Sequence, residues 1–225
     1  MGKICDRVLR KYGSRFTPST IYNVDETAIY FDTPPKHIWA GRGRKGSVKA
    51  KYAEKHSARF TAVMTIRADG KPGGTIEMDE LPNYPQEQGH VYYNGWMDSR
   101  VWEIYAEELL KYQIDSPSVL LADNFDCHVS EEGQKVIARE ANATVCPLPA
   151  NSTGVCQSLD VGVMGPLKKT MRALWLTDFR KGYITASEKR LISIKRTIRA
   201  WALIDSECVV GSFEKAIPRY PVVEV

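Results

Sequence analysis

Stretches of β-branched, aromatic and apolar residues alternate along the chain with polar, glycine-containing turns, and they predict strands. The stretch Ser118–Ala122 is almost entirely apolar, as expected for a central strand buried on both faces. Pro34 and Pro35 end the first strand, and an Asp69-Gly70 turn predicts a hairpin. The expected strands are 19–32, 59–68, 74–78, 118–122 and 143–148.

Apolar residues at helical spacing predict helices between and after these strands. Asp98 precedes the first predicted helix, and Ser130 opens the second, whose first turn holds two glutamates that favour the helix dipole. The expected helices are 99–112, one from Ser130, a basic helix from about 161 to 180, 187–203 and a helical end at 212–216. This order predicts an α/β fold, a mixed five-stranded sheet flanked by helices.

Composition excludes several classes of protein. The 225 residues are 43% hydrophobic and 26% charged, which suits a folded domain with a sizeable core. No apolar run approaches the length of a membrane span, and the first residues lack a secretory signal, so we expect no membrane partner. The five cysteines form no C-x-x-C pair, which argues against a zinc finger or a disulfide framework. We therefore expect an intracellular, reducing location.

Charge is distributed unevenly along the chain. Residues 36–59 hold eight Lys or Arg and one acid, residues 160–199 hold ten Lys or Arg, and the segment between them is acidic. Two basic segments that flank an acidic one predict a surface that binds a polyanion such as DNA, although charged residues also simply solvate loops and helix faces. The candidate nucleic-acid-binding residues are Arg42, Arg44, Lys45, Lys49, Lys168, Lys169 and Arg172.

Three aspartates occupy the ends of predicted strands or the loop after one. Asp25 interrupts an apolar strand, Asp123 follows the most apolar strand, and Asp160 lies where a polar loop turns into a helix. Strand ends in an open α/β sheet converge on one rim, and carboxylates gathered there repel one another unless a cation is present. Oxygen ligands favour Mg²⁺ or Mn²⁺, and a pair of such ions catalyses phosphodiester chemistry. The alternative for each aspartate is a turn or helix cap.

The sequence around these aspartates resembles a known family. Residues 23–27 (NVDET) are similar to the N-x-D-E-T signature of DDE-superfamily transposases of the pogo and Tigger type, to which jerky-like and centromere-protein-B-like proteins are related. Residues 121–128 (LADNFDCH) resemble the family's D-N-x-x-x-H segment. Residues 148–160 (LPANSTGVCQSLD) resemble its L-P-x-N-x-T…Q-P-L-D segment, with Ser158 in place of the usual proline. The three motifs occur in order.

The resemblance implies a ribonuclease H-like fold for residues 18–217, the expected catalytic domain. Residues 1–17 are then an N-terminal basic arm or helix, and residues 218–225 a C-terminal tail. Carried over by motif, Asp25, Asp123 and Asp160 become the catalytic and metal-binding triad. The supporting residues are then Glu26, Asn124, His128 and Gln157. The implied cofactor is Mg²⁺ or Mn²⁺, with two ions during catalysis.

The function implied is that of a DNA endonuclease and strand-transfer core that acts in the nucleus on DNA rather than on a small-molecule substrate. The helix-turn-helix DNA-recognition region usual in this family has no counterpart among the first seventeen residues, so we expect a core that lacks it. That expectation also favours an alternative, a domesticated nuclear module that binds DNA or protein without catalysis. A third alternative is a self-associating scaffold that forms a homodimer, because related systems bring two transposon ends together.

Overall fold

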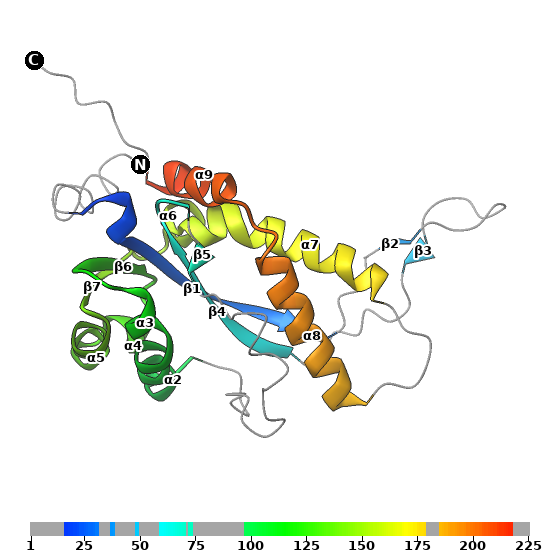
Figure 1. Cartoon of the computed structure of the whole chain (residues 1–225), viewed down its shortest axis with the longest axis horizontal. Coiled ribbons are helices and arrows are strands. Elements are labelled where there is room, and N and C mark those ends of the chain that lie inside the picture. The colour runs from blue at the N-terminus through cyan, green and yellow to red at the C-terminus, as the bar shows by residue number, and fades with distance from the viewer. Residues whose placement is uncertain are drawn as a thin grey trace, which may run out of the picture.

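A mixed β-sheet forms the centre of the computed structural model (Figure 1). The structure describes residues 16–31, 37–38, 48–49, 59–70, 72–73, 97–178 and 185–217. The strands are β1 (Ile21–Tyr30), β2 (His37–Ile38), β3 (Val48–Lys49), β4 (Arg59–Arg67), β5 (Pro72–Gly73), β6 (Ser118–Ala122) and β7 (Ala143–Pro147). The helices are α2 (Ser99–Tyr105), α3 (Lys111–Gln113), α4 (Asp126–Val129), α5 (Glu131–Ala141), α6 (Thr153–Cys156), α7 (Met164–Thr177), α8 (Ala186–Trp201) and α9 (Ser206–Ala216).

The main sheet has the strand order β5-β4-β1-β6-β7. Strand β1 pairs antiparallel with β4 over nine residues and parallel with β6 over three, and β6 pairs parallel with β7. The sheet has the five predicted strands only if β5, which is two residues long, is counted. The other four strands are longer and make up most of the sheet. Strands β2 and β3 pair separately.

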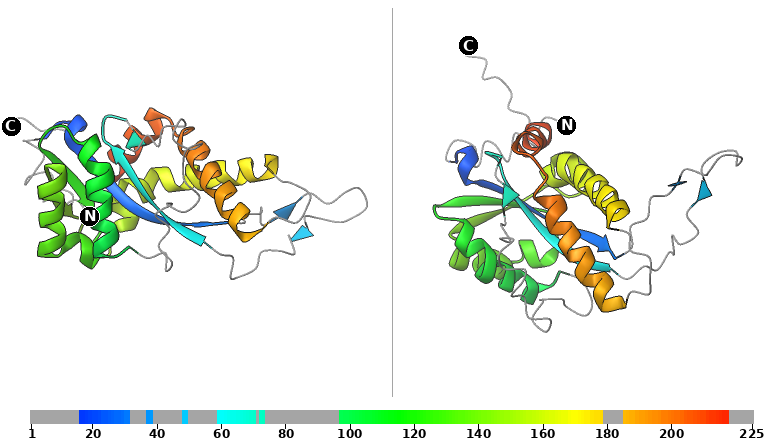
Figure 2. Two further views of the ribbon diagram at one scale, coloured as in Figure 1. Left: turned by 60° about the horizontal axis from the view of Figure 1, so that its bottom comes forward. Right: turned by 45° about the vertical axis from the view of Figure 1, so that its right-hand side comes forward.

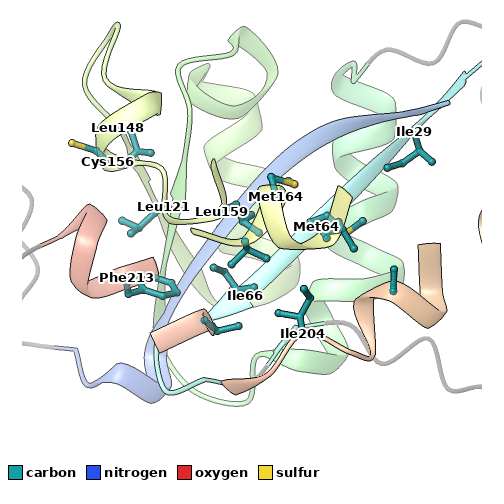
Figure 3. Packing of buried hydrophobic residues seen from close by; sticks show 14 of the residues in the cluster. Ile29, Met64, Ile66, Leu121, Leu148, Cys156, Leu159, Met164, Ile204 and Phe213 are labelled. Atoms are coloured by element: carbon teal, nitrogen blue, oxygen red, sulfur yellow. The ribbon is translucent and has the colours of Figure 1, made fainter. Parts of the chain in front are cut away.

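Helices cover both faces of this sheet (Figures 1 and 2). Strand β1 alternates between the faces: Tyr22 and Val24 pack with α2, α4 and α5, whereas Ile29 packs with α7, α8 and α9. Figure 3 shows the second of these clusters, in which apolar side chains of the sheet meet Met164 and Phe213. All five residues of β6 are buried, as predicted for a central strand.

The helix starts agree with the polar residues that precede them. The Val101 amide donates to the Asp98 carboxylate, and the Gly133 amide donates to the Ser130 hydroxyl. The predicted helix 99–112 runs through α2, a π-helical segment (Ala106–Leu110) and α3. The predicted basic helix extends further toward the N-terminus than expected, because a π-helical segment (Leu159–Val163) leads directly into α7.

Some predicted helix bounds need correction, and some predicted elements lie outside the described residues. The sequence pattern missed the four-residue helices α4 and α6, which are too short to show a periodicity, and it began α9 six residues late. The Asp69-Gly70 turn does join β4 to β5, and Gly70 has the positive φ of 97° that such a turn favours. The predicted strand 74–78, the arm up to residue 15 and the tail 218–225 lie outside the described residues. No helix in the described part of the chain has the length and apolarity to cross a bilayer.

The π-helical segment Leu159–Val163 lies unusually close to α9. A Cβ atom built on Gly162 would meet the Cβ of Ser212 at 2.5 Å and its Cα at 2.9 Å. In addition, the Cys208 thiol donates to the Gly162 carbonyl oxygen at 3.5 Å. Only a residue without a side chain therefore allows this segment to pack against α9.

We predict that Gly162→Ala destabilises the fold by about 1–3 kcal/mol, because the added methyl overpacks the contact with Ser212. The matched control is Gly165→Ala on the exposed side of α7, where an added Cβ meets nothing within 4 Å. That change is expected to stabilise by roughly 0.5–1 kcal/mol through helix propensity. Chemical denaturation of both variants measures the difference, and equal stability would contradict the close packing.

Candidate functional site

The pairing of β1 with β6 places two of the predicted aspartates side by side. Asn23 pairs with Leu121 in the parallel register. Extended by two residues, the same register brings Asp25 opposite Asp123, at the point where β6 ends and β1 continues. Adjacent strands lie about 4.8 Å apart, so the two side chains start from neighbouring backbone positions.

Asn23 ties this pair of strands to the segment before Asp160. Its side-chain amide donates to the Leu121 carbonyl at 3.0 Å and to the Gln157 side-chain oxygen at 2.9 Å. Its own oxygen accepts from the Leu159 backbone amide at 2.9 Å, and Gln157 donates to the Val24 carbonyl at 3.0 Å. Asn23 and Gln157 are completely buried. The start of the π-helical segment is thereby fixed against β1.

Asp160 follows directly after this anchored segment and is exposed. It lies within the π-helical turn, so it is not the N-cap that the alternative interpretation suggested. Burial raises the pKa of Asp25 to about 7, and the nearby Asp160 carboxylate adds to the rise, followed by Glu26, while the Gln157 amide acts in the opposite direction. Asp25 therefore lies in a place that disfavours a negative charge unless a cation is close.

Asp123 lies in a second group of polar side chains, with His128 and Glu26. Asp123 Oδ1 and His128 Nδ1 are 2.7 Å apart, and His128 Nε2 and Glu26 Oε1 are 3.3 Å apart. Burial alone would lower the pKa of His128, but the two carboxylates raise it to about 9. The hydrogen bond with His128 lowers the pKa of Asp123. Asp123 therefore carries its charge at neutral pH and His128 is cationic.

The predicted site residues thus form two neighbouring groups. Asp25 lies near Asp160 and Gln157, and Asp123 lies near His128 and Glu26. Among the described residues, only Glu26, Asp123 and His128 have ligand atoms that all lie within 4.8 Å of one another. The role of the three aspartates as one metal-binding triad stays a prediction.

The remaining predicted residues lie at the edge of the site or outside it. Asn124 is exposed, and its side-chain amide donates to the Leu148 carbonyl oxygen, which joins the ends of β6 and β7. On α7, Lys168, Lys169 and Arg172 are exposed and opposite the buried Leu167 and Met171. Lys49 lies in β3, where only the backbone is described. Arg42, Arg44 and Lys45 lie outside the described residues.

Sequence reasoning missed Asn23, whose side chain joins β1 to β6 and to the segment before Asp160. The signal was present, because an asparagine in an apolar strand must find partners for its amide when it is buried. Its partners, however, are 98 and 134 residues away in the chain, and no local pattern identifies them.

The donor set fits a hard divalent cation. Carboxylate oxygens dominate it, and such oxygens are the ligands that Mg²⁺ and Mn²⁺ prefer. The raised pKa of Asp25 marks a place where negative charge lacks compensation within the described chain. Asp25 and Asp160 are the residues that would hold the ion, together with Asp123 across the strand pair.

Comparison with known proteins agrees with this architecture. The sequence profile of the DDE superfamily endonucleases matches residues 78–213, more than half of the chain, a range that includes Asp123 and Asp160. The fold is similar to that in the crystal structure of the Mos1 mariner paired-end complex with Mn, with 14% identity and a TM-score of 0.56 over 96% of this chain and 57% of that one. The Mos1 strand transfer complex gives 14% identity and a TM-score of 0.60, over 96% and 56%.

The chain spans less than two thirds of the length of these two Mos1 chains. At such low identity the likeness establishes the fold alone. It confirms the predicted ribonuclease H-like class, a sheet flanked by helices.

Ser158 provides a test of the segment that presents Asp160. Its side chain is buried and its hydroxyl finds no hydrogen-bond partner in the described structure. Its φ of −57° suits proline, and Gln157 before it is extended, with ψ of 104°, as a residue preceding proline must be. Proline at this position therefore fits the local backbone.

We predict that Ser158→Pro stabilises the protein by roughly 0.5–1 kcal/mol, because proline reduces the conformational entropy of the unfolded chain and the buried hydroxyl is lost. Ser158→Ala separates the two causes, since it removes only the hydroxyl and is expected to stabilise less. Urea denaturation of the wild type and the two variants measures the change in the free energy of unfolding from each cause. A less stable proline variant would show that the Ser158 backbone N–H is needed or that the ring does not fit.

Proposed function

The chain belongs to the DDE superfamily endonucleases, and from this premise we propose that it hydrolyses DNA phosphodiester bonds with Mg²⁺ or Mn²⁺ bound by Asp25, Asp123 and Asp160. The observation that carries the proposal is the buried hydrogen-bond network of Asn23 and Gln157. It joins the strand of Asp25, the strand before Asp123 and the segment before Asp160. This network supports the proposal that the three carboxylates, which come from distant parts of the chain, act together at one end of the β1–β6 pair.

The chain's own residues have separable tasks in this proposal. Bound divalent ions supply the activation of a water or hydroxyl nucleophile and the stabilisation of the leaving oxygen. Asp25, on the central strand, lies near the Asp160 carboxylate, and the β1–β6 register extended by two residues places its backbone opposite that of Asp123. Gln157 holds the backbone of β1 next to Asp25 through the Val24 carbonyl. The Asp160 carboxylate, which adds to the raised pKa of Asp25, would also attract a cation to this place.

The finer assignment rests on the sequence motifs. We propose the pogo and Tigger type, strand transfer in addition to hydrolysis, and action in the nucleus. The N-x-D-E-T, D-N-x-x-x-H and Q-x-L-D segments support the first of these. The homodimer stays a prediction.

Metal binding is the first test. We predict that the protein binds Mn²⁺ and that Asp25→Asn or Asp123→Asn weakens this binding more than about 10-fold, because each removes a charged ligand. The matched control is Asp126→Asn, a change at an exposed carboxylate on α4 near the site but outside the network. Isothermal titration calorimetry with Mn²⁺ measures all four proteins.

DNA cleavage distinguishes the proposal from its alternative. Nicking of supercoiled plasmid in Mn²⁺ is expected for the wild type and the Asp126→Asn control and is expected to vanish in Asp25→Asn and Asp123→Asn. A protein that binds DNA without cutting it, with binding unchanged in Asp123→Asn, would contradict the nuclease. That result would instead favour the domesticated binding module.

The basic face of α7 predicts how DNA is held. Replacing Lys168, Lys169 and Arg172 together by alanine is expected to reduce the slope of log binding constant against log salt by about 2–3, if each side chain neutralises one phosphate. The control replaces three exposed cations on the other layer, Lys111, Lys135 and Arg139, which already pair with glutamates. Fluorescence anisotropy with a short duplex at several salt concentrations measures both slopes. Equal slopes would remove α7 from the DNA-binding surface.

A further inference from the structure

His128 lies between two carboxylates at the edge of the site. It belongs to α4, a single helical turn that begins three residues after Asp123, and only 1% of its side chain is exposed. Its Nδ1 faces Asp123 Oδ1 at 2.7 Å, and its Nε2 faces Glu26 Oε1 at 3.3 Å. Both ring nitrogens are thus directed at carboxylate oxygens, one from Glu26 in β1 and one from Asp123 just after β6.

The imidazole ring is held in this orientation by aromatic packing. The Trp102 ring lies against it, with centroids 4.3 Å apart and planes inclined by 40°. Trp102 is itself fully buried and donates from its indole nitrogen to the Gly133 carbonyl at 3.1 Å. The Phe125 ring packs edge-on against the imidazole, with ring centroids 5.7 Å apart. The ring therefore has little freedom to turn away from Asp123.

Asp123 is held through only one of its two oxygens. Oδ1 accepts from His128 Nδ1 and also from the Phe125 backbone amide at 3.1 Å. Two donors occupy the lone pairs of that oxygen. Oδ2 accepts no hydrogen bond from the described part of the chain, and the carboxylate is 29% exposed. One oxygen is committed to the protein and the other is left for a ligand.

We propose that His128 is a positioning residue that orients Asp123 for metal binding: it holds Oδ1 so that Oδ2 is presented to the cation. Glu26 holds the other ring nitrogen, Nε2. This inference rests on the proposed function, because it assigns a role within the same site. His128 does not reach the cation in this arrangement, since both of its nitrogens face carboxylates. It acts through Asp123 alone.

Two substitutions separate orientation from packing. In His128→Asn the side-chain nitrogen takes about the place of Nδ1, and in His128→Gln it takes about the place of Nε2. Both remove the ring from Trp102 and are expected to lose similar stability. The asparagine variant is expected to bind Mn²⁺ within about 3-fold of wild type, and the glutamine variant about 10–100-fold more weakly. Calorimetry with Mn²⁺ gives the affinities, and thermal unfolding gives the stabilities.

A second pair tests the outer carboxylate without disturbing the ring. Glu26→Gln and Glu26→Leu each remove one negative charge, but only glutamine keeps an oxygen that can face Nε2. We expect Glu26→Gln to bind Mn²⁺ about 10-fold more tightly than Glu26→Leu. Both substitutions lie at a partly exposed side chain, so the fold is expected to survive them.

The outcomes separate this inference from the function on which it rests. Equal Mn²⁺ affinity in both histidine variants, or affinities that fall only in proportion to stability, would overturn the positioning role while leaving the metal site in place. Equal Mn²⁺ affinities of the two Glu26 variants would show that Glu26 has no part in positioning Asp123. Absence of Mn²⁺ binding by the wild type would overturn the proposed metal site together with this inference.

Discussion

The side-chain amide of Asn23, buried in the sheet, bonds to two separate parts of the chain, Leu121 in β6 and the segment 157–159, and the geometry of the site depends on those bonds. An unmet buried donor or acceptor costs about 1–3 kcal/mol, so the network has little freedom to rearrange. Its bonds to Gln157 and Leu159 fix the backbone immediately before Asp160, although a loop and the short helix α6 precede that segment. The position of the exposed Asp160 carboxylate consequently depends on the buried side chains of Asn23 and Gln157.

This rigidity is what allows like charges to be brought together. A flexible loop would relax so as to separate Asp160 from Asp25, whereas the buried network and the close contact of Gly162 with Ser212 oppose that movement. The cost appears in the pKa of Asp25, raised to about 7 chiefly by burial and then by Asp160. Stability given up at such a site is recovered when a cation binds, because binding to the folded state alone stabilises it.

The sequence was most informative where a local pattern decides the structure. The apolar run of β6, the caps Asp98 and Ser130 and the order of strands and helices were all predictable, because each depends on residues close together in the chain. The motifs around the aspartates identified the family. The two polar groups at the site, around Asp25 and around Asp123, were not predictable, since the contacts that form them link residues on different elements and on opposite faces of the sheet.

Those opposite faces explain why the site has two groups rather than one. Along β1 successive side chains alternate, so Asp25 points toward the layer of α7–α9 with Asn23, whereas Glu26 points toward the layer of α2–α5 and meets His128. Asp123 lies where β6 has ended, so it is accessible from both layers. One layer delivers Asp160 and the other orients Asp123. An adjacent Asp-Glu pair on the central strand thus faces both layers, with Asp25 near Asp160 in one of them and Glu26 near His128 in the other.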